Sequence, residues 1–175
     1  KIVRAGVSVL KIEGRGRSPE YVKMVTECYP EALESIYNQT FNIEKINAWM
    51  DCLRSVYNRD FWDGYYLGRK MGEWAERYGS QATENKVFLG VVTNYFNRIG
   101  VAEARMQTSE SLSIGEEVMI TGQTTGVYRG TITGLRLDSG EVQKVTQGDV
   151  FSFKTGSPVH RGDKLYRVDK VIDEF

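Results

Sequence analysis

The spacing of apolar residues changes near Lys86, from a helical period to strand-like alternation. Before this position, apolar residues recur every three or four positions in two stretches, 22–36 and 43–56, which is the pattern of helices with one buried face. After it, short runs of alternating apolar and polar residues lie between glycine-bearing turns, as they do in strands. We therefore expect an α+β chain in which a helical region precedes a β region.

Two helices are expected in the first region. Ser18-Pro19-Glu20 forms a helix start, because serine can cap, proline suits the first helical position and glutamate favours the positive helix end. Pro30 should kink this helix. A second helix should begin after Asn42 and form a helical hairpin with the first. The expected apolar stripes are Val22, Val25, Tyr29, Ala32, Leu33 and Ile36, then Ile43, Ile46, Trp49, Met50, Leu53 and Val56.

The β region contains many short runs. Asp138-Ser139-Gly140 is suited to a hairpin turn, and the Gly-acid pairs Gly115-Glu116, Gly148-Asp149 and Gly162-Asp163 each precede a run. Short strands with glycine turns predict a small closed barrel. The expected strands lie at 87–91, 102–106, 118–120, 128–137, 141–145, 150–153 and 165–168.

The run from Val7 to Leu10 has the composition of a buried strand. Such a strand needs neighbours on both sides, and no upstream residues supply them. We therefore interpret residues 1–17 as the end of a truncated α/β domain, 18–82 as a helical hairpin and linker, and 83–175 as a C-terminal β-barrel. Residues 58–68 fit neither period and are expected to form an ordered loop.

Two segments together resemble the U-32 peptidase family, whose members are often described as collagenase-like proteases. The first is Leu10-Lys11-Ile12-Glu13-Gly14-Arg15, followed by Ser18-Pro19-Glu20-Tyr21-Val22. The second is Asn58-Arg59-Asp60-Phe61 with Gly64-Tyr65-Tyr66-Leu67-Gly68, and Phe88-Leu89-Gly90-Val91-Val92 is a weaker match to the entry strand of the family's C-terminal barrel. The sequence departs from the family pattern at Pro30, where relatives usually carry arginine.

The resemblance implies that the chain is the C-terminal part of a peptidase. An upstream TIM-barrel-like catalytic domain would carry the family's cysteine-bearing signature, and the strand ending in Arg15 would be among that domain's last. Segments 113–118, 147–150 and 161–165 also resemble the β-barrel second domain of elongation factor Tu, a module that often contacts RNA or a partner domain.

Lys11 and Glu13 are the candidates for the edge of a catalytic site. Strand parity places both on one face, and at the mouth of a barrel that face points to the site. The pair could hold an anionic substrate or tune a proton donor. It could also be a structural ion pair, and Ile-Glu-Gly-Arg also serves as an engineered cleavage linker.

Two further groups are candidates for substrate binding. Arg15 and Arg17 flank Gly16 just before a helix start, where a phosphate or carboxylate would fit; the alternative is a pair of solvated loop arginines. Arg59 could form a stacking surface with nearby aromatic side chains, or the same cluster could be a packed interdomain core. Those aromatic candidates are Phe61, Trp62, Tyr65 and Tyr66.

No metal site is expected within the chain. Cys28 and Cys52 are the only cysteines, and their wide spacing favours free thiols over metal ligands. His160 is the only histidine, and no nucleophile–histidine–acid pattern is visible around it. We expect no cofactor in this chain.

The charge is balanced, with 23 basic and 23 acidic residues, which argues against bulk attraction to nucleic acid or to membranes. Few cysteines and no apolar span favour a cytoplasmic protein without a membrane partner. The oligomeric state is not predicted.

Three functions stay open. In the first, the chain positions a protein or peptide substrate for its own upstream catalytic domain and is inactive alone. In the second, it helps dock RNA for an iron–sulfur-dependent hydroxylation factor acting on RNA bases or quinones, whose cluster would lie upstream. In the third, it is a protein-interaction barrel without catalytic function.

Overall fold

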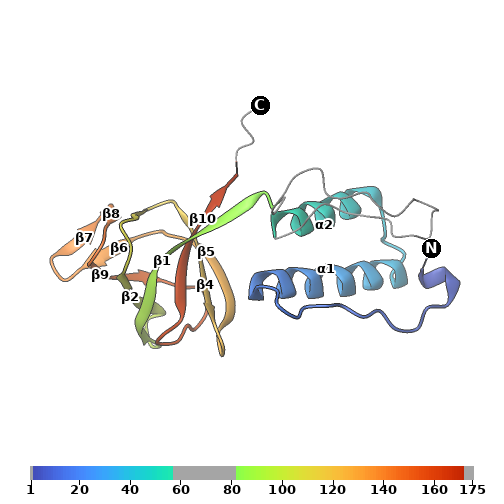
Figure 1. Ribbon diagram of the computed structural model, residues 1–175, viewed down its shortest axis with the longest axis horizontal. Helices are drawn as coiled ribbons and strands as arrows, with labels where there is room; N and C mark the ends of the chain where they lie inside the picture. Colours follow the sequence, from blue (N-terminus) through green and yellow to red (C-terminus); the bar gives the residue numbers. More distant parts are fainter. Residues whose placement is uncertain (1, 57–81, 172–175) are drawn as a thin grey trace. The chain divides into compact units, whose positions relative to one another are not determined.

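The computed structural model describes residues 2–56 and 82–171. The chain divides into two compact units, Lys1–Ala82 and Thr83–Phe175. Figure 1 shows the two helices of the first unit and the strands of the second. Helices followed by an antiparallel sheet confirm the predicted α+β order.

The N-terminal segment corrects one prediction. A short 3-10 helix, η1 (Val3–Ala5), is followed by residues 7–14 without regular structure. Val7, Val9 and Leu10 are 49%, 80% and 42% exposed. A buried strand needs a neighbour on each side, and none of the strands in the described residues pairs with this segment. The predicted buried strand is therefore wrong for this structure, and a remnant of a TIM-barrel-like domain is not shown.

The two predicted helices are present as α1 (Pro19–Tyr37) and α2 (Ile43–Ser55), and they pack against each other. Asn42 caps α2, because its side chain accepts a hydrogen bond from the Lys45 backbone N–H at 2.9 Å. Ser18 precedes α1, but its side chain makes no cap hydrogen bond within the described residues. The helical hairpin is confirmed, but the cap predicted at Ser18 is not formed, and the cap at Asn42 was not predicted.

Helix α1 continues through Pro30 as one element. Its buried side chains are Val25, Cys28 and Ser35, whereas Tyr29 and other members of the predicted stripe are exposed. The buried face is thus rotated from the one that the apolar residues indicated. Val25 belongs to both faces, Val22 and Ala32 are half-buried, and Cys28 and Ser35 lie beside the predicted stripe.

The second unit is built from antiparallel strands. Eight of them form one sheet in the order β5-β4-β10-β1-β2-β9-β6-β7, and two more form the pair β3-β8. The strands are β1 (Glu84–Phe96), β2 (Val101–Met106), β3 (Leu112–Ser113), β4 (Glu117–Gly122), β5 (Gly126–Thr131), β6 (Leu135–Leu137), β7 (Gly140–Val142), β8 (Lys144–Val145), β9 (Val150–Lys154) and β10 (Lys164–Lys170).

The core follows the alternation seen in the sequence. Ala102, Ala104 and Met106 on β2 are at most 1% exposed, as side chains on one face of a half-buried strand should be. Leu112 and Val145 come from the β3-β8 pair and join the same cluster. One hydrophobic core is therefore shared by the large sheet, the short pair and the loop residues Ile132 and Val159.

Strand β1 joins the two halves of the sheet. It pairs with β10 from Glu84 to Val91 and with β2 from Gly90 to Phe96. The register shifts near Gly90, and a Cβ there would overlap the backbone carbonyl of Arg105. Only glycine permits this close approach of two strand backbones.

The predicted closed barrel is not formed. The order of the large sheet ends at β5 and β7, which do not pair with each other among the described residues. The predicted run 128–137 is split into β5, which ends at Thr131, and β6, which begins at Leu135. Between them, Ile132 still exchanges backbone hydrogen bonds with Gly115 and Glu116. The predicted run 141–145 is likewise split into β7 and β8. The predicted turn at Asp138-Ser139 is confirmed, since β6 and β7 form a hairpin around it.

The three Gly-acid pairs share one turn geometry. Each glycine has a φ near 90°, being 93° at Gly115, 92° at Gly148 and 91° at Gly162, a region that favours glycine. The following carboxylate accepts a hydrogen bond from the backbone N–H three residues earlier. These bonds are Ser113 to Glu116 at 2.6 Å, Thr146 to Asp149 at 2.7 Å and His160 to Asp163 at 2.7 Å. The three turns start β4, β9 and β10.

Candidate functional site

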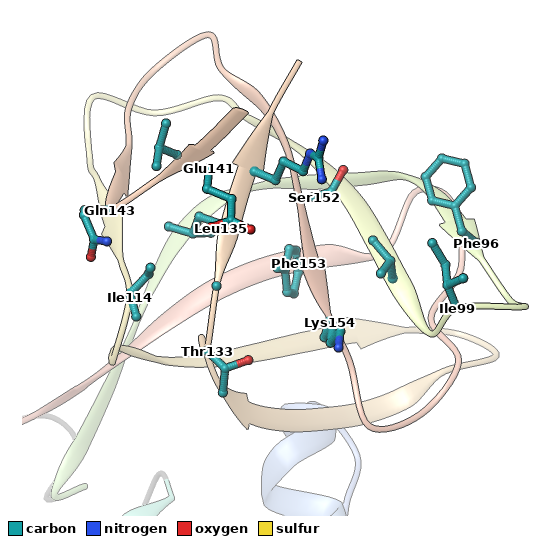
Figure 2. Close-up of a pocket in the computed structure, with 14 residues that line it drawn as sticks. Phe96, Ile99, Ile114, Thr133, Leu135, Glu141, Gln143, Ser152, Phe153 and Lys154 are labelled. Atoms are coloured by element: carbon teal, nitrogen blue, oxygen red, sulfur yellow. The ribbon is translucent and has the colours of Figure 1, made fainter. Parts of the chain in front are cut away.

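A groove of about 640 Å³ lies on the second unit where β6 and β9 separate. These two strands pair only at Arg136 and Ser152, and Gly134 and Lys154 line the groove on either side of the gap. Figure 2 shows Phe153 in the middle, with Ile114 and Gln143 toward one end and Phe96 and Ile99 toward the other. The groove thus results from an interrupted ladder between two strands.

The groove has an apolar floor and apolar walls. Leu135 and Phe153 line it and are also members of the hydrophobic core, only 2% and 3% exposed. Phe96, Ile99 and Ile114 line it from loops and strand ends and are 42%, 65% and 36% exposed. Apolar side chains left accessible beside a groove favour binding of an apolar partner group.

Three charged side chains complete the lining. Arg136 and Glu141 are register partners in the β6-β7 hairpin, so their charges lie on neighbouring strands. Lys154 lies on β9, is exposed, and forms no ion pair with any residue in the ranges 2–56 and 82–171. The arrangement supplies apolar contacts and hydrogen-bonding groups for a ligand. Within the described part of the chain, the groove lining contains neither a histidine nor a cysteine.

A threonine, a histidine and an aspartate also meet between two loops. Thr125 Oγ1 lies 2.8 Å from His160 Nδ1 and 2.5 Å from Asp163 Oδ2. In a catalytic triad the imidazole lies between nucleophile and carboxylate, whereas here the hydroxyl occupies that position. Asp163 is buried and also accepts the His160 backbone N–H. The cluster therefore joins the β4-β5 turn to the loop before β10.

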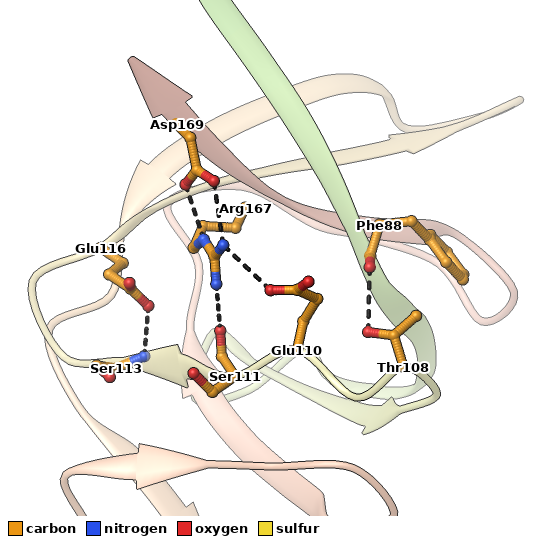
Figure 3. A network of polar contacts seen from close by, with 8 residues as sticks. All are labelled: Phe88, Thr108, Glu110, Ser111, Ser113, Glu116, Arg167 and Asp169. Atoms are coloured by element: carbon orange, nitrogen blue, oxygen red, sulfur yellow. Dashed lines mark hydrogen bonds and ion pairs between the residues drawn. The ribbon is translucent and has the colours of Figure 1, made fainter. Parts of the chain in front are cut away.

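Arg167 on β10 is the centre of the network in Figure 3. Its guanidinium contacts both carboxylate oxygens of Asp169, at 2.7 and 3.0 Å, and the Ser111 carbonyl at 2.7 Å. The hydrogen bonds to Asp169 raise the pKa of Arg167 above its ordinary value, partly offset by burial, and Glu116 and Glu110 add further attraction. These contacts satisfy the arginine within the fold, so we assign it a structural role.

The residues predicted at the catalytic edge lie in the irregular N-terminal segment. Lys11 and Glu13 are exposed. A Glu13 carboxylate oxygen accepts the Arg15 backbone N–H at 2.7 Å, inside the turn that precedes α1. Arg17 lies over the ring of Tyr21 at 5.4 Å. The roles predicted for Lys11, Glu13, Arg15 and Arg17 in a site stay predictions.

The remaining candidates are the predicted stacking residues and the two cysteines. Arg59, Phe61, Trp62, Tyr65 and Tyr66 lie outside the described residues. Cys28 is buried and Cys52 is exposed, and both are free thiols. Burial, with the neighbouring Cys52 thiol as the second cause, raises the pKa of Cys28 to about 11. Across the described residues, no three His, Cys, Asp or Glu side chains are grouped as metal ligands.

The groove was not predicted from the sequence. Its charged residues, Arg136, Glu141 and Lys154, belong to three short strands and have no common motif. The one local signal was Gly134, which interrupts the alternating run between residues 128 and 137.

Comparisons with known proteins identify the family. The model of peptidase family U32 matches residues 1–76. A collagenase of Porphyromonas gingivalis is 48% identical over 170 residues, covering 97% of this chain and 41% of that protein. The chain belongs to peptidase family U32, and the predicted family is confirmed.

More distant relatives carry two kinds of name. An uncharacterised protease of Methanocaldococcus jannaschii is 27% identical over 93% of this chain and 40% of its own length. A tRNA hydroxylation protein of Bacillus subtilis is 29% identical over 54% of this chain and 22% of its own length. The chain thus spans less than half the length of each of these relatives.

A solved structure of the C-terminal domain of a proposed U32 peptidase from Geobacillus thermoleovorans also matches. It covers 46% of this chain and 90% of that domain, with 20% identity and a TM-score of 0.43. None of the helices within the described residues is long and apolar enough to cross a membrane.

Proposed function

We propose that this chain binds polypeptide substrate for a U32 peptidase whose catalytic groups lie in another part of the protein. The observation that carries the proposal is the groove between β6 and β9, with its apolar floor, exposed apolar walls and charged rim. Such a surface can hold an unfolded chain by its apolar side chains. The collagenase name of the relative that is 48% identical favours a polypeptide ligand.

A binding role also fits the chemistry of the described residues. The Thr125 hydroxyl donates within a loop cluster, and Lys11 and Glu13 are exposed on an irregular segment. Neither arrangement presents a nucleophile beside a general base. We therefore propose that the chain alone binds a polypeptide without hydrolysing it.

The test uses the 175-residue chain and heat-denatured collagen immobilised on a biosensor. We expect saturable binding and no new collagen fragments on a gel after long incubation. Replacement of the exposed groove residue in Ile99→Ser should weaken binding. Ile2→Ser, at a similarly exposed apolar residue of the other unit, should leave binding unchanged. Cleavage by the purified chain, or equal binding by both variants, would contradict the proposal.

RNA binding is a second candidate, because two relatives with 27–29% identity are named as tRNA hydroxylation proteins. In this proposal Arg15 and Arg17, beside the start of α1, contact phosphate groups. The iron–sulfur cluster of such a factor would lie outside this chain.

A mobility-shift experiment with bulk tRNA separates the two candidates. A complex that weakens with added salt, and is lost in the double variant Arg15→Ala, Arg17→Ala, would support RNA docking. The matched control is Arg4→Ala, Arg54→Ala, which removes the same number of arginines elsewhere in the first unit. The absence of a complex between the unmodified chain and tRNA at low salt would count against RNA docking.

A further inference from the structure

We infer that the groove binds an extended, acidic-and-apolar peptide segment that lies along the free edge of β9, with an acidic side chain beside Lys154. This inference rests on the proposed polypeptide binding and specifies the ligand of the same groove. It excludes basic segments as preferred ligands. Four features of the groove lead to it.

The first feature is an unpaired strand edge. Strand β9 pairs with β2 from Val150 to Lys154, but on its other side it pairs with β6 only at Ser152. Backbone groups alternate along a strand, so those of Lys154 point to the same side as those of Ser152. The Thr155 N–H donates to the Gly100 carbonyl on the β2 side at 3.0 Å, as this alternation requires. Lys154 therefore presents its backbone groups to the groove.

The second feature is the distribution of apolar side chains. Phe96 and Ile99 lie toward one end of the groove and Ile114 toward the other, with Phe153 between them (Figure 2). An extended segment added to a strand edge directs alternate side chains to the same face. Peptides bound in this way gain affinity from the backbone and specificity from pockets for alternate side chains.

The third feature is charge. Arg136 faces Glu141 across the β6-β7 ladder, and Lys154 forms no ion pair with any of the described residues. The groove therefore carries an excess of one positive charge in a chain of zero formal net charge. Complementary charge on the ligand favours the correct partner and disfavours a basic one.

The fourth feature is space beside Gly134. A Cβ built on Gly134 would meet no heavy atom within 4 Å, and its φ is not positive. A larger side chain can therefore stand at this position without backbone strain and fill the groove. Gly156 also has an ordinary φ, with the nearest atom to its Cβ at 3.9 Å, on Tyr128, and it does not line the groove.

The experiment measures fluorescence polarisation with two labelled heptapeptides, Val-Glu-Val-Glu-Val-Glu-Val and Val-Lys-Val-Lys-Val-Lys-Val. We expect the acidic peptide to bind about fivefold or more tightly than the basic one at low salt, with a preference that shrinks as salt is added. Lys154→Ala should remove most of the preference. Lys170→Ala, at the exposed end of β10, should retain it.

Two glycine variants test the location. Gly134→Leu should weaken binding of the acidic peptide about tenfold or more, because the new side chain occupies the groove, and Gly156→Leu should bind as the unmodified chain does. Circular dichroism melting checks that both variants are folded. A Gly134→Leu variant that melts normally and binds normally would place the site elsewhere and overturn the inference.

The outcomes distinguish this inference from the function on which it rests. Equal affinity for the two peptides, or a preference that survives Lys154→Ala, overturns the ligand assignment and leaves binding of denatured collagen intact. If neither denatured collagen nor either peptide binds, both proposals fail.

Discussion

Arg167 Nε lies 2.7 Å from Asp169 Oδ1, and Arg167 Nη2 lies 3.0 Å from Asp169 Oδ2. The two residues are two positions apart on β10, so their side chains lie on the same face of the strand. The guanidinium and the carboxylate therefore meet in a bidentate pair. The remaining nitrogen donates to the Ser111 carbonyl, 56 residues away in the sequence. One side chain thereby joins β10 to the segment that leads into β3.

This geometry predicts a stability loss in Arg167→Ala. The Arg167 side chain is 15% exposed, so its removal leaves the Ser111 carbonyl and Asp169 without their partner. We expect the free energy of unfolding to fall by about 1–3 kcal/mol. Urea unfolding of the 175-residue chain measures it. Arg105→Ala, at an exposed arginine on β2, should change stability by less than about 0.5 kcal/mol; equal losses in both variants would contradict the assignment.

Two of the Gly-acid turns, at Asp163 and Asp149, should differ in how much they stabilise the chain. Asp163 is buried and accepts hydrogen bonds from both Thr125 and His160, whereas Asp149 is more exposed and bonds only within its own turn. We expect Asp163→Ala to cost about 2–3 kcal/mol and Asp149→Ala about 1 kcal/mol. Thermal melts of both variants rank them. A larger loss in Asp149→Ala than in Asp163→Ala would show that the hydrogen bond between Thr125 and Asp163 adds little stability.

Gly90 should tolerate no larger residue. A Cβ in Gly90→Ala would overlap the backbone carbonyl of Arg105 on the adjacent strand, and a backbone atom cannot move aside as a flexible side chain does. We expect a loss of about 2–3 kcal/mol or failure to fold. The control is Gly134→Ala, whose Cβ meets open space. Expression yield and urea midpoints are compared, and equal midpoints would refute the close approach.

Cys28 should react slowly with alkylating reagents. Burial is the main cause that raises the pKa of its thiol from the ordinary 9.0 to about 11, and the thiolate is the reactive form. Cys52 is exposed and should be modified first. Mass spectrometry of the chain after timed iodoacetamide treatment at pH 8.5 measures both sites, and faster modification of Cys28 would contradict the prediction.

The raised pKa of Cys28 also predicts that the free energy of unfolding depends on pH. Above pH 9 the unfolded chain loses the Cys28 proton while the folded chain retains it, so folding stability contributed by this group falls as pH rises from about 9 to about 11. Below pH 9 the contribution is complete. The difference in unfolding free energy between the unmodified chain and Cys28→Ala should therefore shrink over that range. If the difference in unfolding free energy between the two chains does not change with pH, the raised pKa of Cys28 is refuted.

Several elements could be predicted because their signals are local. Asn42 begins a helix and caps it, Asp138-Ser139 turns a hairpin, and the alternation of Ala102, Ala104 and Met106 places them in the core. In each case the residue types within a few positions determine the backbone conformation. The family was also recognisable, since its motifs are contiguous in the sequence.

Other predictions were wrong where partners decide the outcome. Val7 to Leu10 has the composition of a strand but is exposed and irregular, because composition cannot supply a neighbouring strand. The buried face of α1 includes Cys28 and Ser35 beside its apolar stripe, because burial depends on what packs against a helix as well as on its own hydrophobicity. The closed barrel was expected from the number of strands, but their pairing order is open.

The sequence by itself determined the order of helices before strands, the Asp138-Ser139 and Gly-acid turns, and the family. Only the tertiary structure formed the groove and the loop cluster. Arg136, Glu141 and Lys154 come together because the ladder between β6 and β9 is interrupted, and Thr125 meets Asp163 across 38 positions. Hydrophobic period and turn chemistry act over a few residues, whereas a groove is made by segments that meet only after the sheet has formed.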